Sequence, residues 1–169
     1  MIITKKTKKI TFSLLIIILI GSIALSFKKN TVPDLTMTTI NGKKITTKEL
    51  RGKVVLFNFW ATDCPGCINE MPELINTYNK YKKDNFEVIA VSMFYDPPSR
   101  VITYAKNNKL PFPVILDFDK SIKNAFKNIK LTPTSILIDR NGKLINTIIG
   151  EINFTTFNKL LEEELKKTI

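Results

Sequence analysis

The sequence predicts one α/β domain over residues 30–169, with a mixed β-sheet covered by helices on both faces, preceded by an apolar segment within residues 1–29. Three observations predict this organisation. Short apolar runs alternate with helical patterns from residue 54 onward, as expected for strands joined by helices. The last two runs flank an Asn-Gly turn, so they form an antiparallel hairpin. An uncharged stretch of 18 residues sets the N-terminal segment apart.

Composition excludes several classes of function. The chain has 169 residues and is 44% hydrophobic, which is too ordered a composition for intrinsic disorder. It has no histidine, so Ser-His or Cys-His catalysis and histidine-ligated zinc or copper are excluded. Two cysteines cannot build a scaffold of several disulfides or a four-cysteine metal site. The remaining possibilities are catalysis by a cysteine pair, by carboxylates or by lysines, or no catalysis at all.

The positive charge does not indicate nucleic-acid binding. The net charge is +11, but six lysines and no acid lie within residues 1–29. Residues 30–169 hold 20 basic and 15 acidic residues, a net charge of +5. This is an ordinary solvated surface, and no nucleic-acid motif accompanies it.

The uncharged residues 10–27 predict a membrane helix, because 18 residues form a helix about 27 Å long. A core helix is the weaker alternative, since it would have to be apolar all round. Four lysines precede the segment and two follow it, which leaves the N-terminus in the cytoplasm and exports residues 30–169. We expect a single-pass anchor with the domain in the periplasm or outside the cell. A signal cleaved near residues 22–26, releasing a soluble periplasmic domain, is the alternative.

The domain begins with a hairpin and a buried strand. Asn41-Gly42 supplies the positive φ angles of a tight turn. Residues 54–59 are nearly all apolar, as in a strand buried on both faces. A helix follows the cysteines, because apolar side chains repeat there at helical spacing. These side chains are Cys67, Met71, Leu74, Ile75 and Tyr78.

The later elements alternate and then end in a hairpin and a helix. Strands are predicted at 86–91, 114–116, 134–138 and 143–149, and helices at 99–107 and 121–126. The last two strands flank Asn141-Gly142. The final helix has an apolar face of Phe154, Phe157, Leu161 and Leu165.

Cys64-Pro65-Gly66-Cys67 lies between a buried strand and the start of a helix. Amide groups at a helix N-terminus stabilise a thiolate, which lowers the pKa of Cys64. The two-residue spacing lets Cys67 attack a mixed disulfide formed on Cys64 and resolve it within the chain. Half of a metal site and a structural disulfide closing a very short loop are the alternatives.

Residues 59–67, FWATDCPGC, resemble the active-site segment of thioredoxin-fold proteins, and residues 132–134, Thr-Pro-Thr, resemble the cis-proline loop of that fold. Three further features restrict the resemblance to one group of proteins with this fold. They are Glu-Met-Pro at residues 70–72, the predicted anchor, and the extra helix and strand within residues 99–116. The chain is similar to TlpA-like, membrane-anchored thiol–disulfide oxidoreductases, which include the ResA and cytochrome-c-maturation type. The resemblance covers residues 32–165.

The resemblance implies roles for three catalytic residues. Cys64 would be the nucleophile, exposed at the helix start. Cys67 would be the resolving thiol and more buried. Glu70, one helical turn after Cys67, would be an acid–base group near the thiols, and a surface carboxylate is the alternative.

The resemblance also implies substrate-binding residues. Pro133 would be cis and place the backbone of Thr132 beside the disulfide, where it can pair with an extended substrate. An ordinary trans proline is the alternative. Trp60 would pack beside the disulfide as a wall of the groove, or serve the core alone. Residues 93–98, Met-Phe-Tyr-Asp-Pro-Pro, follow a strand and could contact a partner if their aromatic side chains are exposed.

Two positions depart from the thioredoxin pattern. Asn58 stands where thioredoxins carry a buried aspartate that moves the proton of the second cysteine, which an amide cannot do. Glu70 or water would therefore have to take up the proton of Cys67. Asp63 stands before the nucleophile where an aromatic residue is usual, and its carboxylate should raise the pKa of Cys64. Because a less stable thiolate disfavours the dithiol, we expect a reductant rather than an oxidant.

The resemblance implies an extracytoplasmic thiol–disulfide oxidoreductase that reduces exported cysteine-containing proteins, with a redox-active disulfide and no other cofactor or metal. A membrane electron-donor protein would reduce it again, and the family suggests apocytochrome c as a substrate. A peroxiredoxin-like thiol peroxidase is an alternative, but it needs threonine where this chain has Ala61. A non-catalytic copper-delivery module of the same fold is another, but it needs a histidine ligand.

Overall fold

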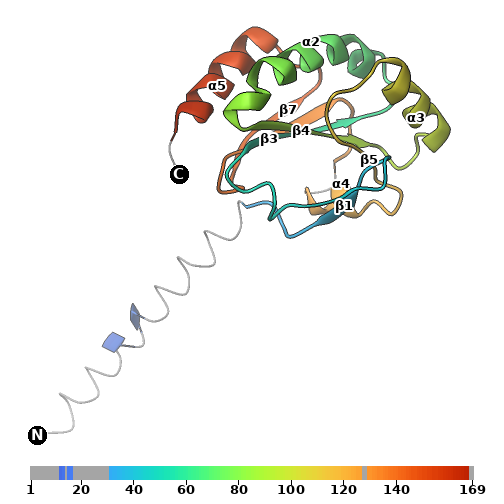
Figure 1. Cartoon of the computed structure of the whole chain (residues 1–169). Coiled ribbons are helices and arrows are strands. Elements are labelled where there is room, and N and C mark those ends of the chain that lie inside the picture. Colours follow the sequence, from blue (N-terminus) through green and yellow to red (C-terminus); the bar gives the residue numbers. More distant parts are fainter. Residues whose placement is uncertain (1–11, 14, 17–30, 127–128, 168–169) are drawn as a thin grey trace, which may run out of the picture. The chain divides into compact units, whose positions relative to one another are not determined.

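The computed structural model describes residues 12–13, 15–16, 31–126 and 129–167. The chain divides into two units, Met1–Thr31 and Val32–Ile169, and the second holds the β-sheet (Figure 1). The predicted membrane segment, residues 10–27, lies largely outside the described residues. Within the described ranges, no helix combines the length and the apolar character needed to cross a membrane.

A five-stranded mixed sheet forms the centre of the second unit, in the order β5-β4-β3-β6-β7. Its strands are β3 (Val54–Trp60), β4 (Phe86–Ser92), β5 (Val114–Leu116), β6 (Thr134–Ile138) and β7 (Leu144–Ile149). β3, β4 and β5 are parallel to one another, whereas β6 pairs antiparallel with both β3 and β7. The predicted mixed sheet and its terminal hairpin are therefore confirmed.

Helices and a small hairpin cover the two faces of this sheet (Figure 1). On one face lie α2 (Pro65–Tyr81), α3 (Pro98–Asn107) and α5 (Phe154–Lys166). On the other lie α4 (Ser121–Ala125) and the hairpin of β1 (Thr36–Thr38) and β2 (Lys44–Thr46). A short 3-10 helix, η1 (Lys82–Asp84), follows α2. The predicted covering of both faces is confirmed.

Strand β3 shows why the core has two layers. All seven of its residues are buried, and successive side chains point to opposite faces of the sheet. Leu56 and Trp60 pack in the core beneath α2, α3 and α5. Val55 and Phe57 pack in the core beneath α4 and the hairpin. Asn58 alone interrupts the apolar run, and its side chain belongs to the site described below.

The sheet topology brings two loops together at one edge. Because β3 and β6 are antiparallel, Phe59 near the end of β3 lies opposite Thr134 at the start of β6. The residues that follow β3 are the Cys64–Cys67 segment, and those that precede β6 are Thr132 and Pro133. Both segments therefore lie at the same edge of the sheet.

Candidate active site

The two cysteines lie where β3 passes into α2 and form a disulfide, with their Cα atoms 5.3 Å apart. Cys64 is the N-cap of α2, and its Sγ accepts the backbone N–H of Cys67 at 3.3 Å. Pro65 follows in the first turn of the helix. A backbone N–H at this position would have no acceptor within the helix, so the N–H that proline lacks costs no hydrogen bond. Cys64 is partly exposed, whereas Cys67 is fully buried. The more accessible sulfur thus lies at the helix N-terminus, which favours a thiolate there.

Glu70 lies on the buried face of α2, and only 4% of it is exposed, so the surface-carboxylate alternative is wrong. Its Oε1 accepts a hydrogen bond from Asn58 Nδ2, and its Oε2 accepts one from the backbone N–H of Ile152, both at 2.9 Å. Burial raises the pKa of Glu70, and these two hydrogen bonds only partly offset the effect. A carboxyl group with a raised pKa is better suited to exchange a proton near neutral pH.

Asn58 connects Glu70 to strand β6. It is fully buried, and its Nδ2 donates both to Glu70 and to Ser135 Oγ, the latter also at 2.9 Å. Among the described residues its Oδ1 has no hydrogen-bond partner. An amide cannot take up the proton of a thiol, so Asn58 holds the carboxyl group of Glu70 in place instead.

The Thr132–Pro133 peptide bond is cis, as predicted. Pro133 is buried, and its carbonyl oxygen accepts the backbone N–H of Gly150 at 2.8 Å. Thr132 is partly exposed, and its Oγ1 lies 3.5 Å from the hydroxyl of Tyr95. Thr132 therefore lies partly exposed in the cis-proline loop, beside the loop that follows β4.

Trp60 is fully buried at the end of β3. Its ring packs against Tyr104 of α3, with the ring centroids 5.2 Å apart, in the same core as Cys67. Its Nε1 has no hydrogen-bond partner within the described part of the chain. Because α3 covers this ring, Trp60 presents no surface to a substrate in this structure. Its placement agrees with the core alternative and not with a wall of the groove.

The loop between β4 and α3 contacts both active-site loops. Phe94 and Tyr95 are 37% and 48% exposed, so the condition for contact with a partner is met. Asp96 is instead 4% exposed, and its carboxylate accepts the backbone N–H and the hydroxyl of Thr62, each at 2.6 Å. The role of Asp96 could not be predicted from the sequence, because a single aspartate in a loop carries no signal of the distant loop that it contacts.

The contacts that the turn between β7 and α5 makes with the site were also not predicted from the sequence. The N–H of Gly150 binds the carbonyl of Pro133, and the N–H of Ile152 binds Glu70. These contacts use backbone groups, which no residue type reveals. The one available signal was Gly150 itself, whose φ of 91° is a conformation that favours glycine.

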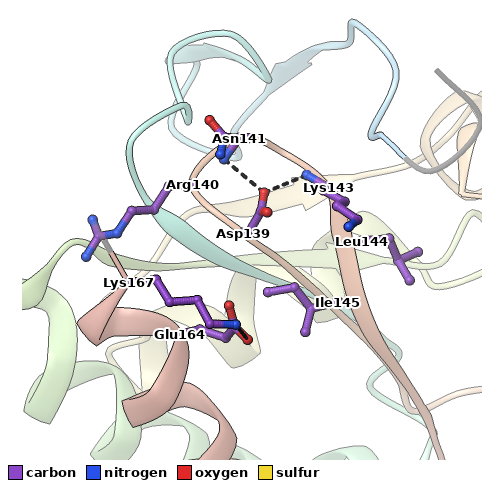
Figure 2. A pocket seen from close by; sticks show the side chains of 8 residues that line it. All are labelled: Asp139, Arg140, Asn141, Lys143, Leu144, Ile145, Glu164 and Lys167. Atoms are coloured by element: carbon purple, nitrogen blue, oxygen red, sulfur yellow. Dashed lines mark hydrogen bonds and ion pairs between the residues drawn. The ribbon is translucent and has the colours of Figure 1, made fainter. Parts of the chain in front are cut away.

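A pocket of about 380 Å³ lies at the other end of β6, around the turn of the β6–β7 hairpin (Figure 2). There Asp139 Oδ1 accepts the backbone N–H groups of Asn141 and Lys143, at 2.9 and 2.8 Å. Glu164 forms an ion pair with Lys167 at 2.6 Å. Backbone N–H groups satisfy Asp139, and Lys167 satisfies Glu164, which indicates a structural role in the turn and in α5.

The fold and the site together define a class: a thioredoxin-fold protein with a Cys-x-x-Cys disulfide at the start of a helix and a cis-proline at the same edge of the sheet. A family model described as Redoxin matches residues 27–162, and the chain belongs to this family.

Relatives with known names agree with this class. The thiol-disulfide oxidoreductase ResA of Bacillus thuringiensis subsp. konkukian is 40% identical over 135 residues, which cover 80% of this chain and 75% of that protein. ResA of Bacillus subtilis is 33% identical over 118 residues, covering 70% and 65%. The crystal structure of StoA from Bacillus subtilis is 25% identical, with a TM-score of 0.67, covering 78% and 98%. A thiol:disulfide interchange protein from Chlorobium tepidum TLS is 25% identical, with a TM-score of 0.74, covering 80% and 96%.

The protein is thus a thiol–disulfide oxidoreductase of the ResA and StoA type, with its cysteine pair at Cys64 and Cys67. The thioredoxin fold predicted from the active-site segment is confirmed.

Proposed function

We propose that this enzyme reduces disulfides of exported, cysteine-containing proteins on the outer side of the cytoplasmic membrane. The observation that carries the proposal is the asymmetry of the cysteine pair. Cys64 is partly exposed at the N-terminus of α2, whereas Cys67 is fully buried one turn further on. Only the first sulfur can meet a protein substrate, and the second is placed to finish the reaction.

The reaction starts from the dithiol. The Cys64 thiolate attacks one sulfur of the substrate disulfide, forming a mixed disulfide and releasing the other substrate sulfur as a thiolate that takes up a proton. Cys67 then gives its proton to the carboxylate of Glu70 and attacks the sulfur of Cys64. The mixed disulfide breaks, and the second substrate sulfur leaves as a thiolate. Two electrons have passed to the substrate, the Cys64–Cys67 disulfide has closed, and no bound cofactor or metal has taken part.

The surface beside Cys64 supports a polypeptide as the substrate. The backbone of Thr132 would pair with an extended segment of it, as strand addition requires. The exposed ring of Tyr95 contacts Thr132 of this loop, and the ring of Phe94 packs against that of Tyr95, with their centroids 5.3 Å apart. A depression of about 540 Å³ runs from Thr62 along α3 and is lined mostly by polar side chains.

The acidic surroundings of the pair support reduction over oxidation. Asp63 directly precedes Cys64, and Glu70 lies buried on the same helix. Negative charge near the sulfur disfavours the thiolate and hence the dithiol, so the couple gives up its electrons more readily. A membrane electron-donor protein would restore the dithiol. Apocytochrome c, whose haem-attachment motif carries two cysteines, is the proposed substrate.

The proposed organisation is an anchor or signal segment in residues 1–29 and a thioredoxin-like domain in residues 30–169. The lysines on both sides of residues 10–27 support an exported domain. A membrane-impermeant thiol reagent, applied to intact cells after reduction, should label Cys64. Labelling only after lysis would place the domain in the cytoplasm and contradict the proposal.

The decisive experiment traps the intermediate. In the Cys67→Ser variant the mixed disulfide on Cys64 cannot be resolved, so covalent complexes should accumulate in the cell envelope and be identified by mass spectrometry. Cys64→Ser is the matched control and should trap nothing. Capture dominated by apocytochrome c would support that substrate, and broad capture would indicate general reduction instead. Equal trapping by both variants would show that the roles of the cysteines are wrongly assigned.

A further inference from the structure

Three consecutive residues between β7 and α5 each contact a different part of the site. Gly150 donates its N–H to the carbonyl of cis-Pro133, and Ile152 donates its N–H to Glu70. Glu151 lies between them, and its side chain reaches Gly66 inside the Cys64–Cys67 segment. Because both neighbours of Glu151 are hydrogen-bonded to the site, its backbone is held in place beside the N-terminus of α2.

The contact between Glu151 and Gly66 is close. A Cβ atom added to Gly66 would lie 2.9 Å from Glu151 Oε1 and 3.1 Å from its Cγ. The carboxylate therefore occupies space that a glycine leaves free. Gly66 belongs to the first turn of α2, where backbone N–H groups lack helical partners and the dipole is positive. A carboxylate there competes with the Cys64 sulfur for the same favourable field.

We propose that Glu151 is a positioning residue of the dithiol site, whose negative charge, held against Gly66, disfavours a thiolate on Cys64 and keeps the pair a reductant. The inference rests on the proposed function, in which Cys64 is the attacking sulfur. The charge of Glu151 also acts within the site, since it helps to raise the pKa of Glu70. Asp63, before Cys64, and Glu70, on α2, are acids as well. The negative charges of all three acids therefore disfavour a thiolate on Cys64.

The test is the Glu151→Gln variant of the full chain, which keeps the shape of the side chain and removes its charge. The rate of Cys64 alkylation by iodoacetamide, measured against pH in the reduced protein, reports the pKa of this thiol because Cys67 is buried. We expect the pKa to fall by about half a unit at low salt, which is about threefold more thiolate below the pKa. Above the pKa, the equilibrium with glutathione should shift about threefold toward the dithiol.

Two further variants separate this effect from a change in overall charge or structure. Glu163→Gln removes an exposed carboxylate from α5 and should leave the pKa of Cys64 unchanged. Gly66→Ala displaces the Glu151 carboxylate without removing it, so it should also lower the pKa of Cys64. In the Glu151→Gln background the same alanine should have a smaller effect, because the charge it displaces is gone.

An equal response of Glu151→Gln and Glu163→Gln would overturn the inference. If the wild-type pair exchanges with glutathione normally in that case, the proposed function still stands and only the role of Glu151 fails. If the wild-type Cys64 does not exchange with glutathione at all, the proposed function fails first.

Discussion

Asp96 accepts two hydrogen bonds from Thr62, one from its backbone N–H and one from its hydroxyl, each 2.6 Å long. Thr62 lies two residues before Cys64, and Asp96 belongs to the loop that follows β4, so this pair joins the nucleophile's loop to the neighbouring strand. The carboxylate is almost completely buried. Its position is therefore fixed by these contacts and not by solvent.

We expect Asp96→Asn to lower the free energy of unfolding by about 1–3 kcal/mol, because the amide loses charge-assisted hydrogen bonds and turns a donor toward donors. Urea unfolding of the oxidised protein measures this. Thr62→Val is the matched control, since it removes the hydroxyl and keeps the backbone N–H. The double variant should lose less than the two single losses added together. Full additivity would show that the two residues do not act as a pair.

The buried Glu70 predicts a stability that depends on pH. Its pKa is raised by burial in the folded protein, so the folded state holds the proton more tightly than the unfolded state. The resulting stabilisation is complete below the usual glutamate pKa and is lost as the pH rises through the raised pKa. Glu70→Gln should therefore gain stability relative to wild type as the pH rises above the usual glutamate pKa, through the range in which the folded protein still holds this proton. The free energy of unfolding of both proteins, measured against pH, checks this. The same pH dependence in both would contradict a buried, titrating Glu70.

Asp63 is exposed, so its effect on Cys64 should be small and sensitive to salt. We expect Asp63→Asn to lower the pKa of Cys64 by at most about half a unit at low ionic strength, and less in high salt. Alkylation of the reduced protein against pH measures the change. An unchanged pKa at low salt would remove Asp63 from the explanation of a reducing couple.

Trp60 should matter for stability and not for substrate binding, since it is fully buried against Tyr104. We expect Trp60→Phe to lower the free energy of unfolding by about 1–3 kcal/mol, because it leaves a cavity, while the KM for a protein disulfide stays unchanged. The exposed Phe94 is the converse control. Phe94→Ala should raise this KM, and its cost in stability should be limited to the contacts that this ring makes with Tyr95 and Lys120. A higher KM in Trp60→Phe would show that Trp60 contributes to the substrate-binding groove.

Much of the fold followed from local patterns in the sequence. The apolar run at 54–59 predicted a strand buried on both faces, and β3 is buried along its whole length. Asn141-Gly142 predicted the hairpin that β6 and β7 form. The cis peptide before Pro133 was predicted from the resemblance alone, because a proline in a single sequence does not report its isomer.

The environment of the carboxylates could not be predicted in the same way. A surface position on α2 was the alternative for Glu70, because its buried contacts are with Asn58 of β3 and with the backbone of Ile152, 82 residues away. Asp96 and Glu151 were missed because the groups they contact lie in other loops.

By itself, the sequence determined the elements of this domain and the place of its two sulfurs, because hydrophobic periodicity, turn residues and cysteine spacing act over a few neighbouring residues. Only the tertiary structure decided which acids surround those sulfurs. The order of strands brings loops distant along the chain to one edge of the sheet, and long-range hydrogen bonds and burial there set the charge and the proton affinity of each group.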